Sequence, residues 1–191
     1  MEEKTNLKKV FLVYFHGNFI PLQGVKYIIG AAKVLLPHED IRIKIIGAGS
    51  GYDEIRALAI KLELKNIDFV GRLPVEQLPA HLLEADVCLG IFGATPKTQR
   101  VIPNKVYESI AMAKPAISAD TPAMKELFTD RENILFCRHA DPEDLAAKIL
   151  ELKNNEELKN KIARGGYELF QKRAAPRIVA KNLLSELEAY K

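Results

Sequence analysis

The sequence predicts a doubly wound α/β protein, a Rossmann-like parallel sheet of six strands with helices on both faces. Two features indicate this fold. Short apolar runs alternate with longer segments of helical period, and the alternation repeats six times along the chain. The runs are apolar at nearly every position, which is typical of strands that crossover helices bury on both faces. We expect the strand order 3-2-1-4-5-6, in which the loops after the first and fourth strands lie side by side.

The elements follow in chain order. Strands are expected at residues 10–15, 41–46, 67–70, 87–92, 116–118 and 134–136. Helices are expected after them at about 24–36, 52–64, 75–84, 104–113, 122–128 and 142–153. The chain therefore reads as one domain, 1–191, with a core at about 9–154 and C-terminal helices at 156–191.

The C-terminal segment is mostly charged and helical in pattern. Pro176 divides it into two helices, because a proline ring cannot continue a helix. Apolar residues recur on one stripe of the second helix, namely Ile178, Leu183, Leu184 and Leu187. We expect this stripe to pack on the same domain.

Composition excludes several classes of protein. The chain has 28 basic and 25 acidic residues and a net charge of +3, a balance that argues against a nucleic-acid partner. Its two cysteines show no spacing typical of a metal site or a disulfide scaffold. No apolar stretch approaches the about 18 residues of a membrane span, and the first residues contain no signal-peptide segment. We expect a cytoplasmic protein, peripheral at the inner membrane face at most.

A glycine-rich turn follows the second predicted strand, with the sequence Gly47-Ala48-Gly49-Ser50-Gly51-Tyr52. Dinucleotide-binding proteins cradle a pyrophosphate on such a turn, but their fingerprint requires glycine at the position of Tyr52 and follows the first strand. The pattern therefore fails here, and a tight turn without ligand contact explains the glycines equally well. An NAD(P)-binding or other nucleotide-binding Rossmann domain stays open as an alternative.

Ligands of open parallel sheets bind beyond the carboxyl ends of the strands, so the loops at 16–24, 47–52, 71–75 and 93–105 are the candidate site. Helix amino ends at this edge carry unpaired N–H groups and a partial positive charge, which suit phosphate. His16, at the end of the first strand, is placed to bond a phosphate or a sugar hydroxyl, or is structural.

Several motifs occur in an order and spacing that points to one family. They are GNFIPLQG at 17–24, IGAG at 46–49, FVGRL at 69–73, ADV at 85–87, IPNKVYESIAMAKPAI at 102–117 and DPEDLA at 141–146. Together they resemble the group 1 retaining glycosyltransferases, in particular their carboxyl-terminal, nucleotide-sugar-binding domain. The resemblance implies one half of a GT-B fold that binds a nucleoside diphosphate sugar as substrate, with no cofactor and no metal.

The resemblance also implies roles for residues of the proline-x-lysine-x-x-glutamate stretch. Glu108 matches the glutamate that binds the ribose hydroxyls, and a carboxylate does accept two hydrogen bonds from a vicinal diol. The amides of Asn104, Lys105 and Val106, at a helix amino end, match the diphosphate site. The other implied donor-site residues are Gly17, Asn18, Gln23 and Gly24 in the first loop and Arg72 beside the nucleobase.

Two departures from the family pattern affect this site. Asn18 and Gln23 stand where the family has an arginine and a lysine on the diphosphate, so both first-loop cations are missing. Arg100 stands eight positions before Glu108, where the family has its first glutamate. Lys97, Arg100 and Lys105 are the nearby replacement cations, or simply surface charges. No catalytic residue is assigned, because the family's sugar-contacting acid is absent.

The resemblance also implies a missing partner. Enzymes of this family react in a cleft between a donor and an acceptor domain, and only the donor domain is recognisable in this sequence. The acceptor domain is then elsewhere in a longer protein or on a partner chain. We expect nucleotide-sugar recognition by a hexosyltransferase-type glycosyltransferase that is incomplete alone. A non-catalytic nucleotide-binding interaction module remains the further alternative.

Overall fold

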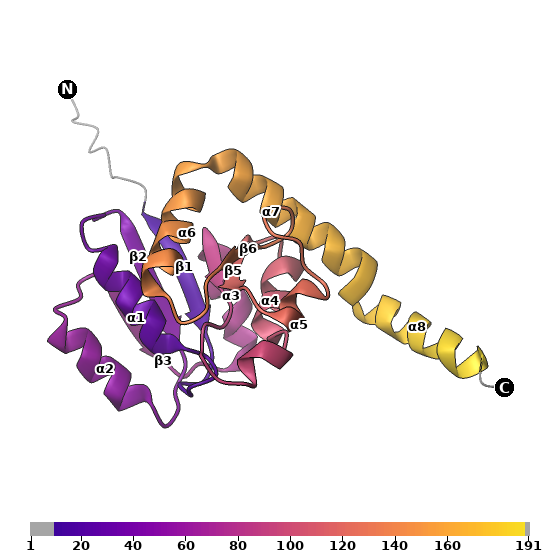
Figure 1. Cartoon of the computed structure of the whole chain (residues 1–191), viewed down its shortest axis with the longest axis horizontal. Coiled ribbons are helices and arrows are strands. Elements are labelled where there is room, and N and C mark those ends of the chain that lie inside the picture. The colour runs from indigo at the N-terminus through magenta and orange to yellow at the C-terminus, as the bar shows by residue number, and fades with distance from the viewer. Residues whose placement is uncertain (1–9, 190–191) are drawn as a thin grey trace.

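The computed structural model describes residues 10–189 and contains the expected sheet (Figure 1). Six strands lie in the order β3-β2-β1-β4-β5-β6, and each neighbouring pair is parallel. Their bounds are β1 Phe11–His16, β2 Ile41–Ile46, β3 Ile67–Gly71, β4 Val87–Leu89, β5 Ala116–Ala119 and β6 Leu135–Cys137. The predicted strand order is therefore confirmed, and the order reverses between β1 and β4.

A helix follows each strand, as the sequence predicts. The bounds are α1 Val25–Val34, α2 Tyr52–Lys61, α3 Leu78–Glu84, α4 Asn104–Ala111, α5 Pro122–Lys125 and α6 Pro142–Asn154. Two short 3₁₀ turns, η1 Val75–Gln77 and η2 Thr98–Arg100, precede α3 and α4. Within residues 10–189, no helix combines the length and apolar character that crossing a bilayer requires.

The two faces of the sheet carry separate apolar layers, because successive strand residues point to opposite sides. On β1, Val13 and Phe15 pack in the layer under α1, α2 and α6, whereas Tyr14 packs in the layer under α3. Ile46 and Cys88 join Tyr14 on that second face. Strands β1, β4, β5 and β6 are thus buried at nearly every position, which explains why they are short apolar runs. Strands β2 and β3 are open to solvent on one face, where Arg42 and Asp68 are exposed.

Strand β4 is shorter than the predicted run at 87–92. Ile91 and Phe92 are buried as expected, but the backbone N–H of Phe92 donates to the carbonyl of Gln23 (3.1 Å) instead of continuing a strand ladder. The chain therefore leaves the sheet toward the loop that follows β1. This departure brings the loops after β1 and β4 together at the carboxyl edge of the sheet.

The C-terminal segment forms α7, Glu156–Leu169, and α8, Pro176–Ala189, joined by a π-helical turn at Phe170–Ala174. The predicted break at Pro176 is confirmed. The prediction that the apolar stripe of the last helix packs on the domain is wrong: α8 buries no residue, and Leu183, Leu184 and Leu187 are 59%, 60% and 56% exposed. The turn and Pro176 direct α8 away from the sheet (Figure 1).

Candidate functional site

The candidate site lies at the point where the strand order reverses, between β1 and β4. The first loop, residues 17–24, follows β1, and α4 follows β4, so the two face each other across this point. In doubly wound sheets the carboxyl ends of the strands leave a crevice there. The sequence placed both the first loop and the start of α4 in the site, and the structure brings them into contact.

His16 and Glu108 form a pair that links β1 to α4. The Nε2 atom of His16 lies 2.9 Å from Oε2 of Glu108. The histidine side chain is 13% exposed and the glutamate side chain 49% exposed, so the carboxylate is reachable from solvent while the ring is nearly enclosed. This pairing was not predicted; the only signal for it is a histidine at the end of the strand beside the reversal point.

Lys105 points inward rather than into solvent. The residue is 6% exposed, and its ammonium lies 3.9 Å from the ring centroid of Phe15 and donates to the side-chain oxygen of Gln23. The alternative that Lys105 is a simple surface charge is therefore wrong. Gln23 is the position where the resemblance implies a first-loop lysine, and Lys105 of α4 places its ammonium against that position.

Burial and neighbouring charges set the protonation of this cluster. Burial lowers the pKa of the Lys105 ammonium to about 7, against the opposing attraction of Glu108. The hydrogen bond from His16 is the main cause that lowers the pKa of Glu108, whose carboxyl is therefore ionised at neutral pH. The site thus holds a fixed anion and a cation whose charge changes near neutral pH.

The amino end of α4 offers fewer open amides than the sequence suggested. The N–H of Val106 donates to the carbonyl of Pro103 (3.0 Å), and the Val106 side chain is buried. The expectation that the Val106 amide is open is therefore wrong, because a tight first turn occupies it, and a contact of Val106 with the diphosphate stays a prediction. The amides of Asn104 and Lys105 come first in the helix and have no acceptor within it.

Two glycines of the first loop allow its close approach to the rest of the site. Gly24 has φ 69° and precedes α1, and a Cβ there would lie 2.4 Å from the backbone nitrogen of Gly93. A Cβ on Gly17 would lie 2.6 Å from Nζ of Lys105. The predicted importance of both positions thus has a steric basis, since any side chain would displace the loop or the lysine.

The glycine-rich turn after β2 is bound to the first loop. The N–H of Phe19 donates to the carbonyl of Ala48 (3.0 Å), and the N–H of Gly51 donates to the carbonyl of Phe19 (3.0 Å). The ring of Tyr52 packs edge-on against Phe19, with ring centroids 5.1 Å apart. These contacts support the interpretation of this segment as a tight turn, which holds the first loop in place.

The remaining predicted residues are exposed on the loops around this cluster. Asn18 lies in the first loop, Arg72 follows β3, and Arg100 ends the turn η2. Among residues 10–189, no carboxylate forms an ion pair with Arg72 or Arg100. Buried Thr98 donates to the carbonyl of Leu22 (3.5 Å), which ties η2 to the first loop. Both arginines are therefore available to a ligand.

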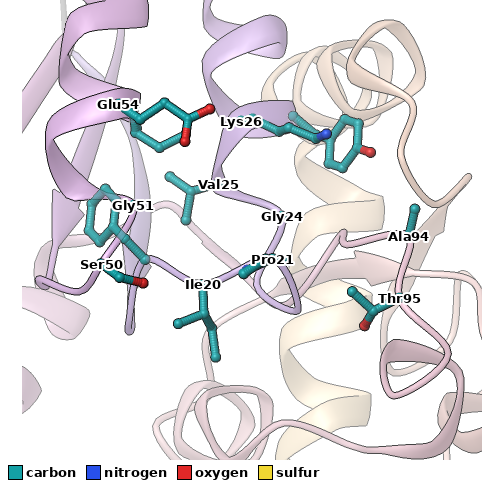
Figure 2. Close-up of a pocket in the computed structure, with 13 residues that line it drawn as sticks. Ile20, Pro21, Gly24, Val25, Lys26, Ser50, Gly51, Glu54, Ala94 and Thr95 are labelled. Atoms are coloured by element: carbon teal, nitrogen blue, oxygen red, sulfur yellow. The ribbon is translucent and has the colours of Figure 1, made fainter.

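A cavity of about 430 Å³ lies between the first loop, α1, α2 and the loops after β2 and β4. Ile20 and Pro21 of the first loop, Glu54 of α2 and Thr95 of the loop after β4 surround it (Figure 2). Its lining includes Gly24 and parts of three predicted loops, 16–24, 47–52 and 93–105, but neither Lys105 nor Glu108. The space beside α1 is thus distinct from the cluster around Lys105 and Glu108.

A carboxylate, a cation and open helix amides at the reversal point of a doubly wound sheet are typical of α/β domains that bind phosphate-bearing ligands. Comparison with known sequences narrows this class. The chain belongs to the group 1 glycosyl transferases, whose family model matches residues 1–169. The family expected from the loop motifs is confirmed.

Individual relatives agree with this assignment. An uncharacterized glycosyltransferase of Methanocaldococcus jannaschii is 30% identical over 158 residues, which are 83% of this chain and 42% of the relative. Anabaena HepE, solved with UDP-glucose, is similar with a TM-score of 0.82 at 17% identity, over 94% of this chain and 49% of that one. The C-terminal domain of the group 1 protein LpcC of Francisella tularensis has a TM-score of 0.73 at 21% identity, over 85% of each chain. The chain thus spans less than half the length of the Methanocaldococcus relative. The structures of HepE and of the LpcC domain have the same fold as this chain.

Proposed function

We propose that this chain is the donor-binding, C-terminal domain of a retaining glycosyltransferase. Its substrate is a nucleoside diphosphate sugar, from which the complete enzyme transfers the sugar to an acceptor hydroxyl. The observation that carries the proposal is the meeting of Glu108, Lys105 and the first loop across the reversal point, in a chain of the group 1 family. The UDP-glucose complex of HepE and the C-terminal position of the LpcC domain support the same assignment.

The donor lies along the carboxyl edge of the sheet. The half-exposed carboxylate of Glu108 accepts hydrogen bonds from the two ribose hydroxyls. The diphosphate lies against the amides of Asn104 and Lys105, with the ammonium of Lys105 behind it and the backbone of the first loop opposite. Arg72 flanks the nucleobase, and Arg100 contacts the diphosphate or an acidic sugar.

The chemistry assigned to the complete enzyme is transfer with retained configuration. The acceptor oxygen attacks the anomeric carbon on the face from which the nucleoside diphosphate leaves, through an oxocarbenium-like state. The amino end of α4 and the cations beside it stabilise the charge that develops on the diphosphate, so the proposal invokes no metal. The acceptor site belongs to a second domain or a partner chain.

Calorimetry with the 191-residue chain tests the binding step. We expect UDP or GDP to bind without added metal, and Glu108→Ala to weaken that binding by about 1 to 3 kcal/mol, the usual effect of losing hydrogen bonds to a charged group. Glu84→Ala, which changes an exposed carboxylate at the end of α3, is the matched control and leaves the affinity unchanged.

The alternatives give different results in the same assay. A dinucleotide-dependent oxidoreductase would bind nicotinamide cofactors and reject nucleoside diphosphates. An interaction module without a nucleotide site would bind neither kind of ligand and would copurify with a partner chain. Either outcome would overturn the proposed function.

A further inference from the structure

The contact between His16 and Glu108 joins a nearly enclosed side chain to an accessible one. His16 is the last residue of β1, held in register opposite Ile46 of β2, and its ring lies against that of Tyr14 with centroids 5.4 Å apart. Glu108 belongs to the second turn of α4. The imidazole is therefore fixed by the sheet, and the 2.9 Å contact passes this fixed position on to the carboxylate.

Stability alone is a weak reason for such a pair. An ion pair with one exposed partner contributes little to folding, because solvent screens the attraction. Holding a glutamate in a single rotamer, in contrast, removes conformational freedom that a ligand would otherwise have to remove on binding. The geometry therefore favours a role in binding over a role in folding.

The hydrogen-bonding capacity of Glu108 fits a diol. A carboxylate has two oxygens with about four acceptor positions. His16 occupies one position on Oε2 and leaves Oε1 and the remaining lone pair of Oε2 for two further donors. To donate from Nε2, a neutral His16 must carry its proton on that atom. The His16 ring thus fixes the orientation of the carboxylate and leaves acceptor positions open for a ligand.

We propose that His16 is a positioning residue that holds the Glu108 carboxylate in the orientation that accepts both ribose hydroxyls, and so makes the site selective for ribonucleotides over deoxyribonucleotides. This inference rests on the proposed function, since it assumes that Glu108 contacts the ribose. It adds a residue that acts through Glu108 and does not itself touch the ligand.

The test compares UDP with 2′-deoxy-UDP by calorimetry on the full chain. Wild type is expected to prefer UDP. His16→Phe keeps a ring but removes the donor, and we expect UDP binding to weaken about tenfold, as for a lost hydrogen bond to a charged group. Binding of 2′-deoxy-UDP should weaken by about twofold or less, because one of the two oriented contacts is already missing. The preference for UDP therefore shrinks.

Two further variants separate orientation from folding. His16→Gln keeps an N–H donor at similar reach, and we expect it to restore most of the preference for UDP. His38→Phe changes a histidine near the amino end of β2, at the opposite edge of the sheet, and should leave both affinities unchanged. Thermal melts of each variant report whether the fold is retained.

The outcomes are distinct. Equal weakening of both ligands by His16→Phe, or an unchanged preference for UDP, overturns the positioning role. If His16→Phe does not fold, His16→Gln provides the test. A loss of the preference for UDP in His16→Gln then overturns the proposal, because this variant keeps the N–H donor. If wild type binds neither nucleotide, the proposed function fails and this inference fails with it. If wild type binds UDP and 2′-deoxy-UDP equally, the ribose contact and this inference are refuted, whereas nucleotide binding by the domain stands.

Discussion

Lys105 buries an ammonium group at the carboxyl edge of the sheet, and its replacement by methionine has a calculable effect on stability. The residue is 6% exposed, and burial lowers the pKa of its ammonium from 10.5 to about 7. Methionine has a similar length and no charge, and flexible thioethers fill such spaces well. Lys105→Met therefore removes the titrating group while keeping most of the packing against Phe15.

The linkage between protonation and folding gives the sign of the effect. Between pH 7 and 10.5 the folded state binds fewer protons at Lys105 than the unfolded chain does, so wild-type stability rises with pH in this window. Below pH 7 both states are protonated, and the folded state carries the full cost of burying the charge.

The magnitude of the stability difference follows from the lowered pKa of Lys105. A pKa difference of one unit corresponds to about 1.4 kcal/mol, so burying the charged ammonium of Lys105 costs about 5 kcal/mol of folding free energy. Lys105→Met removes this cost but also loses the hydrogen bond to Gln23, which is worth about 1 kcal/mol. We expect Lys105→Met to be more stable than wild type below pH 7 by several kcal/mol. The advantage should shrink steadily as the pH approaches 10.5.

Urea unfolding of both proteins at pH values from about 6.5 to about 9.5 measures this difference directly. Subtracting the two free energies of unfolding cancels the titration of every other group. Lys97→Met, at an exposed lysine just before η2, is the matched control and should differ from wild type by a constant. A difference between Lys105→Met and wild type that does not change with pH would refute the reasoning.

Three further substitutions test the first loop and the turn beside it. Gln23→Lys places a second cation next to Lys105, so like-charge repulsion should lower the melting temperature of the free chain. The same variant should tighten UDP binding in calorimetry, and an unchanged affinity contradicts a diphosphate at this place. Gly24→Ala forces a Cβ to within 2.4 Å of Gly93 and should cost about 2 kcal/mol or more in urea unfolding, whereas Gly71→Ala, with open space around it, costs only the strain of its positive φ. Arg100→Ala should weaken nucleotide-sugar binding, and an unchanged dissociation constant removes Arg100 from the site.

Hydrophobic periodicity was sufficient to predict the architecture. The six strands and the helices after them were located because most strands are buried on both faces, which makes them short apolar runs, while β2 and β3 keep an apolar face. The strand predicted at 87–92 is wrong only at its carboxyl end, since β4 ends at Leu89. Phe92 is as apolar as a strand residue, but its N–H bonds to Gln23 across the reversal point, and no local pattern records that partner.

The candidate site was predicted as a set of positions more reliably than as a set of contacts. The first loop, Lys105 and Glu108 were expected together and lie together, because motifs at the ends of strands converge on one edge of a parallel sheet. The contact between Glu108 and His16 was not expected. Their proximity depends on the order of β1 and β4 in the sheet rather than on any spacing along the chain.

By itself, the sequence determined the doubly wound fold, the helix break at Pro176 and the family, because these follow from local periodicity, backbone chemistry and ordered motifs. Only the tertiary structure decided that Lys105 is buried with a lowered pKa and that the apolar stripe on α8 is exposed. A lysine loses its water only when the first loop closes over it, and an apolar helix face is buried only if the chain turns it toward the core. Both outcomes depend on where distant segments lie in space, which residue order alone does not specify.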